Sequence, residues 1–124
     1  MSLDVFLESG DEFDREVAER VLARNGISAD DIVTTADGGE ASVSVDDDGV
    51  VLVIRALTPE LVDVIFEVAA GTKLAILPAD GTPTAYVAGD VTVPDELDAV
   101  DVPDSKTLFG ALRMSEELRG SHQA

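Results

Sequence analysis

Residues 49–77 read GVVLVIRALTPELVDVIFEVAAGTKLAIL and decide the fold. Their first part, Val50–Ile54, is a continuous apolar run, which predicts a strand covered on both faces. Thr58-Pro59 predicts a helix start, because threonine caps backbone amides and proline fits the first helical position. We expect this helix to span residues 60–70 and an apolar strand to follow at 74–77. The stretch therefore predicts a strand–helix–strand unit on which the rest of the chain packs.

The helix of this unit is more apolar than a surface helix should be. Val64 and Val68 extend its apolar side around most of the circumference, and only three acids mark a polar stripe. We expect Gly71 to end it, since glycine readily takes the left-handed conformation at a helix C-terminus. A helix with so wide an apolar surface is expected to be buried on more than one side.

The flanking sequence supplies further elements with clear periodicity or turn signals. They are a strand at 3–7, a helix at 12–25 capped by Ser9 or Asp11, a hairpin of strands at 40–45 and 50–56, a strand at 84–88 and a helix at 105–119 capped by Asp104 or Ser105. Residues 27–39 and 91–103 lack such a period, so we expect a connector and an extended arm there.

The order of these elements predicts an α+β protein. The first six match the ferredoxin-like βαββαβ sandwich, in which two helices cover one face of an antiparallel sheet. We expect the first and third strands to be central and parallel, and we expect an extra C-terminal strand, arm and helix. Residues 1–90 would form the sandwich core, and residues 91–124 would pack on the core or on a partner subunit.

The composition is strongly acidic, with 26 Asp plus Glu against 8 Lys plus Arg and a formal net charge of −18. The acids are scattered and lysine is scarce, a bias that resembles halophilic proteins, whose carboxylate surfaces stay hydrated in concentrated salt. An acidic mimic of nucleic acid is the alternative. The charge argues against nucleic acid and anionic membranes as direct partners, because both need basic patches.

The start of the chain and the absence of cysteine bear on location. Met1-Ser2-Leu3-Asp4 lacks the basic start and long apolar stretch of a signal peptide. The chain contains no cysteine, so it has no disulfide framework and no thiolate chemistry. We therefore expect a cytoplasmic protein.

No motif in the sequence predicts catalysis, a cofactor or a metal. The one histidine, His122, lies close to the chain end, which argues against a histidine-based triad or metal site. The run Asp46-Asp47-Asp48 is contiguous, whereas a calcium loop needs alternating acids, so we interpret it as a hairpin tip. Arg55 and Tyr86 are the ligand candidates, although an ion pair with Glu40 or with another acid at a strand end is the simpler role for Arg55.

The function predicted best is a non-enzymatic interaction or regulatory module. If both helices of the sandwich cover one sheet face, the apolar residues on the other face, which come from Phe6, Val50–Ile54 and Leu74–Leu77, need a second cover. We expect either the helix at 105–119 or a second chain, in a homodimer or with another protein, to provide it. The candidate interaction residues are therefore Val51, Val53, Leu108, Phe109 and Leu112. The alternative is a small-ligand or enzyme domain with a site between the sheet and residues 91–119.

Overall fold

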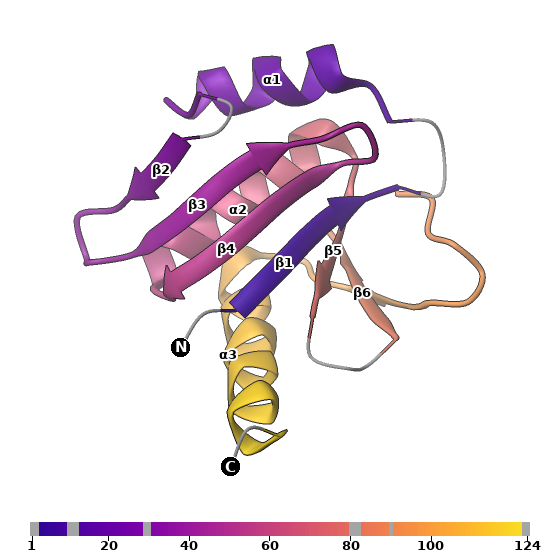
Figure 1. Ribbon diagram of the computed structural model, residues 1–124. Coiled ribbons are helices and arrows are strands. Elements are labelled where there is room, and N and C mark those ends of the chain that lie inside the picture. The colour runs from indigo at the N-terminus through magenta and orange to yellow at the C-terminus, as the bar shows by residue number, and fades with distance from the viewer. Residues whose placement is uncertain (1–2, 10–12, 29–30, 80–82, 90, 123–124) are drawn as a thin grey trace.

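The computed structural model describes residues 3–9, 13–28, 31–79, 83–89 and 91–122. The elements follow in the order β1 (Leu3–Glu8), α1 (Arg15–Arg24), β2 (Asp31–Thr34), β3 (Glu40–Val45), β4 (Val50–Ala56), α2 (Pro59–Thr72), β5 (Ala75–Pro78), β6 (Thr84–Val87), β7 (Asp98–Asp101) and α3 (Ser105–His122). Figure 1 shows the sheet with α2 behind β3 and β4. The predicted α+β class is confirmed. None of the helices in the described ranges is both long and apolar enough to cross a membrane.

The seven strands form one mixed sheet in the order β2-β3-β4-β1-β5-β6-β7. All neighbours pair antiparallel except β6 and β7, which are parallel. The four strands expected for a ferredoxin-like sandwich are adjacent, as β3-β4-β1-β5. However, β2 extends one edge and β6 and β7 extend the other, so the sheet does not match that four-stranded layout.

The predicted parallel pairing of the first and third strands is wrong. β1 pairs antiparallel with β4, with Leu3 opposite Ile54 and Leu7 opposite Val50. Two successive reversals join β2, β3 and β4, so β4 keeps the direction of β2, and both run opposite to β1. The start of β4 lies so close to β1 that a side chain on Gly49 would collide with the backbone carbonyl of Leu7.

Alternation along the strands places one set of side chains on a common core face. From β1, β3 and β4 this set is Leu3, Val5, Leu7, Ala41, Val43, Val45, Val50, Leu52 and Ile54, and all are buried. Residues of all three helices pack against it, which places the three helices in one layer on this face. The three described helices therefore cover one face of the sheet, and none of them lies on the second face.

Helix α2 lies in the middle of the helical layer, in contact with α1 on one side and α3 on the other. This position explains its wide apolar surface, because three directions are covered: the sheet and two neighbouring helices. Thr58 is its N-cap and Pro59 its first residue, as predicted. Deep burial of α2 is thus confirmed, with Leu61, Val62, Ile65, Val68 and Ala69 buried.

Helix α2 continues past the predicted stop at Gly71. A side chain on Gly71 would lie 2.9 Å from Cγ1 of Val21, so this glycine allows close packing of α1 on α2. The helix ends instead at Lys73, which takes the left-handed conformation with φ of 57°. This conformation is unfavourable for a residue that carries a Cβ atom.

We expect Lys73→Gly to stabilise the protein by about 0.5–1 kcal/mol, because glycine adopts a positive φ without steric cost. The measurement is the urea midpoint at fixed salt and pH. Lys73→Ala removes the same positive charge but keeps the Cβ atom, so it should bring no gain. Equal midpoints for both variants would show that relief of the left-handed conformation at residue 73 does not stabilise the protein.

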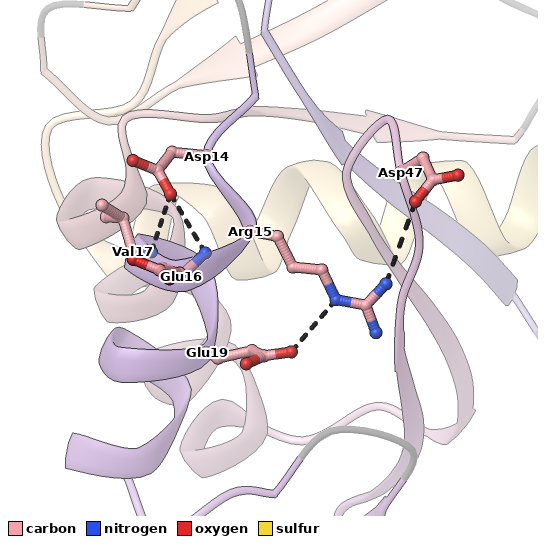
Figure 2. A network of polar contacts seen from close by, with 6 residues as sticks. All are labelled: Asp14, Arg15, Glu16, Val17, Glu19 and Asp47. Carbon is pink, nitrogen blue, oxygen red and sulfur yellow. Dashed lines mark hydrogen bonds and ion pairs between the residues drawn. The ribbon is translucent and has the colours of Figure 1, made fainter.

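Helix α1, which follows β1, begins at Arg15, three residues later than predicted. Asp14 is its N-cap, and one carboxylate oxygen accepts hydrogen bonds from the amides of Glu16 and Val17 at 3.0 and 3.3 Å. Figure 2 shows this cap. The expected cap by Ser9 or Asp11 is wrong, because Asp14 stands directly before the first helical turn; Asp11 itself lies outside the described residues.

Two strands were not predicted. β2 contains Ile32, Val33 and Thr34, and this β-branched run within the expected connector was a usable signal. β7 lies in the expected arm and all four of its residues are exposed, so no apolar period marks it. It is held by backbone hydrogen bonds at its ends, from Asp98 N to Pro83 O at 2.7 Å and from Val102 N to Val87 O at 2.9 Å.

Helix α3 confirms the predicted C-terminal helix but not its expected place over the second sheet face. It contacts α2 and β1 on the covered face. Asp104 caps it by accepting from the amide of Thr107 at 2.8 Å, and this bond lowers the pKa of the Asp104 carboxyl. The Ser105 hydroxyl also donates to Asp63 of α2. These contacts hold α3 beside α2, so it cannot be the missing cover.

Candidate functional site

The second face of the sheet is covered over only one half. Ala75, Ala85 and Val87 on β5 and β6 are buried in a small apolar cluster of their own. Three residues of the 91–97 segment, Val91, Val93 and Leu97, pack on this cluster together with Leu77. The arm expected at 91–103 thus acts as a lid on the β5–β6 half of the face.

On the other half, formed by β2, β3, β4 and β1, no segment of the described residues forms such a lid. We call it the open half-face; its side chains are Asp4, Phe6, Glu8, Ile32, Ser42, Ser44, Val51, Val53 and Arg55. Two rows cross the strands: Ile32, Ser42, Val53 and Asp4 are paired in one, and Ser44, Val51 and Phe6 in the next. In Figure 1 this half faces the viewer, with α2 on its far side.

The open half-face carries an apolar centre. Phe6, Val51 and Val53 are half-buried, and none of them belongs to either apolar cluster of the molecule. Ile32 on the edge strand β2 is 59% exposed, the second most exposed large apolar side chain in the described part of the chain. Sequence reasoning missed Ile32 because it did not recognise β2 as a strand.

The five candidate interaction residues are divided between the two sides of the sheet. Val51 and Val53 lie on the open half-face, as the alternation of β4 requires. Leu108 and Leu112 are fully buried in the main core, and Phe109 is half-buried against it. The Arg113 guanidinium lies over the Phe109 ring, 5.9 Å from its centre. The structure therefore places Val51 and Val53 beside Phe6 and on the same face as Ile32, away from the α3 residues.

The two ligand candidates also lie apart. Arg55 is exposed at the end of β4 on the open half-face. Tyr86 of β6 pairs with Ile76 and packs against the main core on the covered face. β1 and β5 separate their strands, a distance of about 14 Å at the usual strand spacing. The structure therefore does not bring Arg55 and Tyr86 to a common site.

Arg55 does not form the expected ion pair with Glu40. Both residues are described, and no nitrogen–oxygen distance between them is within 4.0 Å. The pairing of β3 with β4 shifts between Glu40 and Ala41, so Glu40 lies opposite Ala56 and its side chain is displaced from Arg55. The prediction of this pair is therefore wrong.

The aspartate run is a hairpin tip, as expected. One Asp46 carboxylate oxygen accepts from the amides of Asp48 and Gly49 at 3.1 and 3.2 Å, which closes the turn. Arg15 lies between Glu19, at 3.1 Å, and Asp47, at 3.9 Å, and so links α1 to this tip (Figure 2). No cluster of metal-ligating side chains occurs in the described ranges. The side chain of His122 lies outside them.

A second polar network joins the β2–β3 turn to the start of α2. The Asp37 carboxylate accepts hydrogen bonds from the hydroxyls of Thr35 and Thr58, at 2.6 and 2.7 Å, and from the amide of Glu60 at 3.1 Å. Gly39 lies against the two threonines, where any side chain would collide with their hydroxyls. This carboxylate thus completes the cap of α2.

The network determines the charge state of Asp37. Partial desolvation raises its pKa, but the hydrogen bonds from the threonine hydroxyls and from the amides of Glu60 and Gly39 outweigh this effect. Together they lower the pKa of Asp37 from 3.8 to about 2. A carboxylate with its acceptor positions occupied in this way is a structural group, not a general acid.

We expect Asp37→Asn to lower stability at pH 7 and to make it less sensitive to acid. The pKa of Asp37 is depressed in the folded state, so its contribution is present above about pH 4 and is lost as the pH falls toward 2. Urea midpoints between pH 7 and pH 2.5 at fixed salt provide the measurement. The difference from the wild type should shrink as the pH falls.

Asp48→Asn is the matched control, because it removes the same charge from the exposed hairpin tip. It should leave the midpoint at pH 7 nearly unchanged. An Asp37→Asn variant that is as stable as this control would contradict a structural role for the network.

Hollows lined by described residues border on the helices. One of them, between α1, α2 and the sheet, has a volume of about 10 Å³ and an entirely apolar lining that includes Leu22, Val43 and Ile65. A hollow of about 320 Å³ lies where α1 and α2 end, at Arg24 and Phe66. Another of about 520 Å³ lies at residues 13–16. Neither Arg55 nor Tyr86 lines any of the three.

Comparison with known proteins adds no relative to this picture. No family model matches the chain, and neither a curated protein nor a solved structure matches it. The candidate site therefore stands on its geometry alone: a flat, partly apolar half-face on one side of the sheet.

Proposed function

We propose that the protein is a non-enzymatic interaction module that associates with a second copy of itself through the open half-face. One observation carries this proposal. Phe6, Val51 and Val53 are held side by side on β1 and β4, on a face without a described helix. The exposed Ile32 lies on the same face, two strands from Val53 and separated from it by Ser42. Exposed apolar patches on soluble proteins commonly mark association sites.

The covered half of the same face supports this reading. On that half, the 91–97 segment packs on the buried apolar residues of β5 and β6. The neighbouring four strands carry the apolar centre of Phe6, Val51 and Val53, and none of the described segments packs on it as the 91–97 segment does on β5 and β6. A second copy laid face to face would bury that centre in the way two sheets pack in a sandwich.

The size of the open half-face sets the expected strength of association. Four strands of about six residues span an area of about 19 by 20 Å, or on the order of 400 Å² in projection. Stable protein interfaces bury about 800 Å² of accessible surface on each partner. The open half-face is small by this standard, so we expect a weak and reversible dimer.

We also propose that the protein works at high salt. The ion pairs found between described side chains are those of Arg15 with Glu19 and Asp47, so most carboxylates there have no basic partner. Repulsion within a chain of net charge −18 is weakened when salt shortens the screening length to about 3 Å at 1 M. Both folding and self-association of such a chain should gain from salt.

Val51→Asp and Val53→Asp should raise the dissociation constant of the dimer about 100-fold, because each interface would bury two unpaired charges. Sedimentation equilibrium at 2 M KCl over a range of concentrations provides the measurement, with circular dichroism to confirm folding. Met114→Asp is the matched control: it places the same charge on α3 at a residue that is 64% exposed. The control should dimerise like the wild type.

Two outcomes would contradict the proposed function. If the wild-type protein sediments as a monomer at all concentrations, it does not self-associate. Folded Val51→Asp and Val53→Asp variants that dimerise as well as Met114→Asp would place the interface elsewhere.

Salt should also raise the thermal stability of the monomer. We expect the melting temperature of Val51→Asp to rise steadily from 0.1 M to 2 M KCl, because screening weakens repulsion between the carboxylates. This variant removes the contribution of dimerisation, so the rise reports on the chain itself. A melting temperature independent of KCl would contradict adaptation to high salt.

A further inference from the structure

Arg55 is unusual among the residues of the sheet. It is the one basic residue in the seven described strands, which otherwise carry only neutral and acidic side chains. It is exposed, and no ion pair is found for it among the described residues. An unpaired guanidinium beside an apolar centre is a suitable group for binding an acidic side chain of a partner.

The acid it could meet in a second copy follows from the strand register. The apolar centre lies in two adjacent rows, one through Val51 and Phe6 and one through Val53. Leu52 marks the level between these rows. Arg55 lies three residues beyond that level along β4, which is about 10 Å at the usual rise per residue.

Glu8 lies about as far on the other side of the same level. Leu7 is paired with Val50, so the next residue of β1 comes level with Gly49, three residues before Leu52. A side chain on Gly49 would indeed lie 3.4 Å from Cγ of Glu8. Glu8 also alternates onto the open half-face, since Leu7 points into the core.

Twofold symmetry then relates the two groups. In a twofold interface between identical copies, each contact occurs twice. If residue i of the first copy contacts residue j of the second, residue j of the first copy contacts residue i of the second. A twofold axis that crosses the strands at the level of Leu52 reverses the strand direction. It therefore places Arg55 of each copy above Gly49 of the other copy. Glu8 of that other copy lies level with Gly49 on the neighbouring strand β1.

We propose that Arg55 is the specificity-determining residue of the dimer and pairs with Glu8 of the second copy, twice per interface. This inference rests on the proposed function, because it assumes self-association through the open half-face. It adds the relative direction of the two sheets. Asp4 lies level with Val53, close to the axis, and so does not come opposite Arg55.

Charge reversal tests the pairing. Arg55→Glu and Glu8→Arg should each raise the dimer dissociation constant about 10-fold at the lowest KCl concentration at which the wild type dimerises, where charges are screened least, because each loses two ion pairs and creates two like-charge contacts. The double variant Arg55→Glu/Glu8→Arg should dimerise within about threefold of the wild type, since the pairs are restored in reverse. Sedimentation equilibrium measures all three.

Two controls separate this pairing from net charge and from general proximity. Arg113→Glu on α3 changes the net charge as much as Arg55→Glu does, away from the open half-face, and should leave the dimer unchanged. Asp4→Arg combined with Arg55→Glu should fail to restore it. Restoration by Asp4→Arg in place of Glu8→Arg would overturn the proposed direction of the sheets.

The inference and the proposed function fail in different ways. If Val51→Asp breaks the dimer while Arg55→Glu behaves like Arg113→Glu, the self-association stands and the role of Arg55 is wrong. If the wild type does not dimerise, both are wrong.

Discussion

The antiparallel pairing of β1 with β4 is the constraint on which the rest of the structure depends. It sets Leu3 opposite Ile54 and Leu7 opposite Val50, so the buried side chains of both strands point to one face. A slip of one residue would turn this whole set to the other face, at a cost of about 1.5–3 kcal/mol for each large side chain exposed. The lack of a side chain at Gly49 permits the close approach at the end of this pair.

The same alternation creates the candidate site. Once the core set of β1 and β4 faces the helices, Phe6, Val51 and Val53 must face the other way. All three helices pack on one face because α2 needs a neighbouring helix on each side to bury its wide apolar surface. The second face is left with a short arm over one half, and the other half remains as the surface through which we propose self-association.

The acidic surface and the polar networks divide the carboxylates into two kinds. Asp14, Asp37 and Asp104 accept backbone amides at the starts of the three helices, where the helix dipole favours a negative charge. Most others have no basic partner in the described part of the chain. We propose that these carboxylates serve hydration in salt and that Arg55 contacts a partner.

The sequence by itself determined the local elements and the class of fold. Apolar periodicity and the Thr58-Pro59 cap predicted α2, its deep burial and the strands around it, because these signals act over a few residues. Only the tertiary structure decided which face α3 covers, that β2 and β7 join the sheet, and that Arg55 and Tyr86 lie apart. Pairing of exposed edge strands depends on backbone hydrogen bonds to distant segments such as Pro83 and Val87, which leave no period in the sequence.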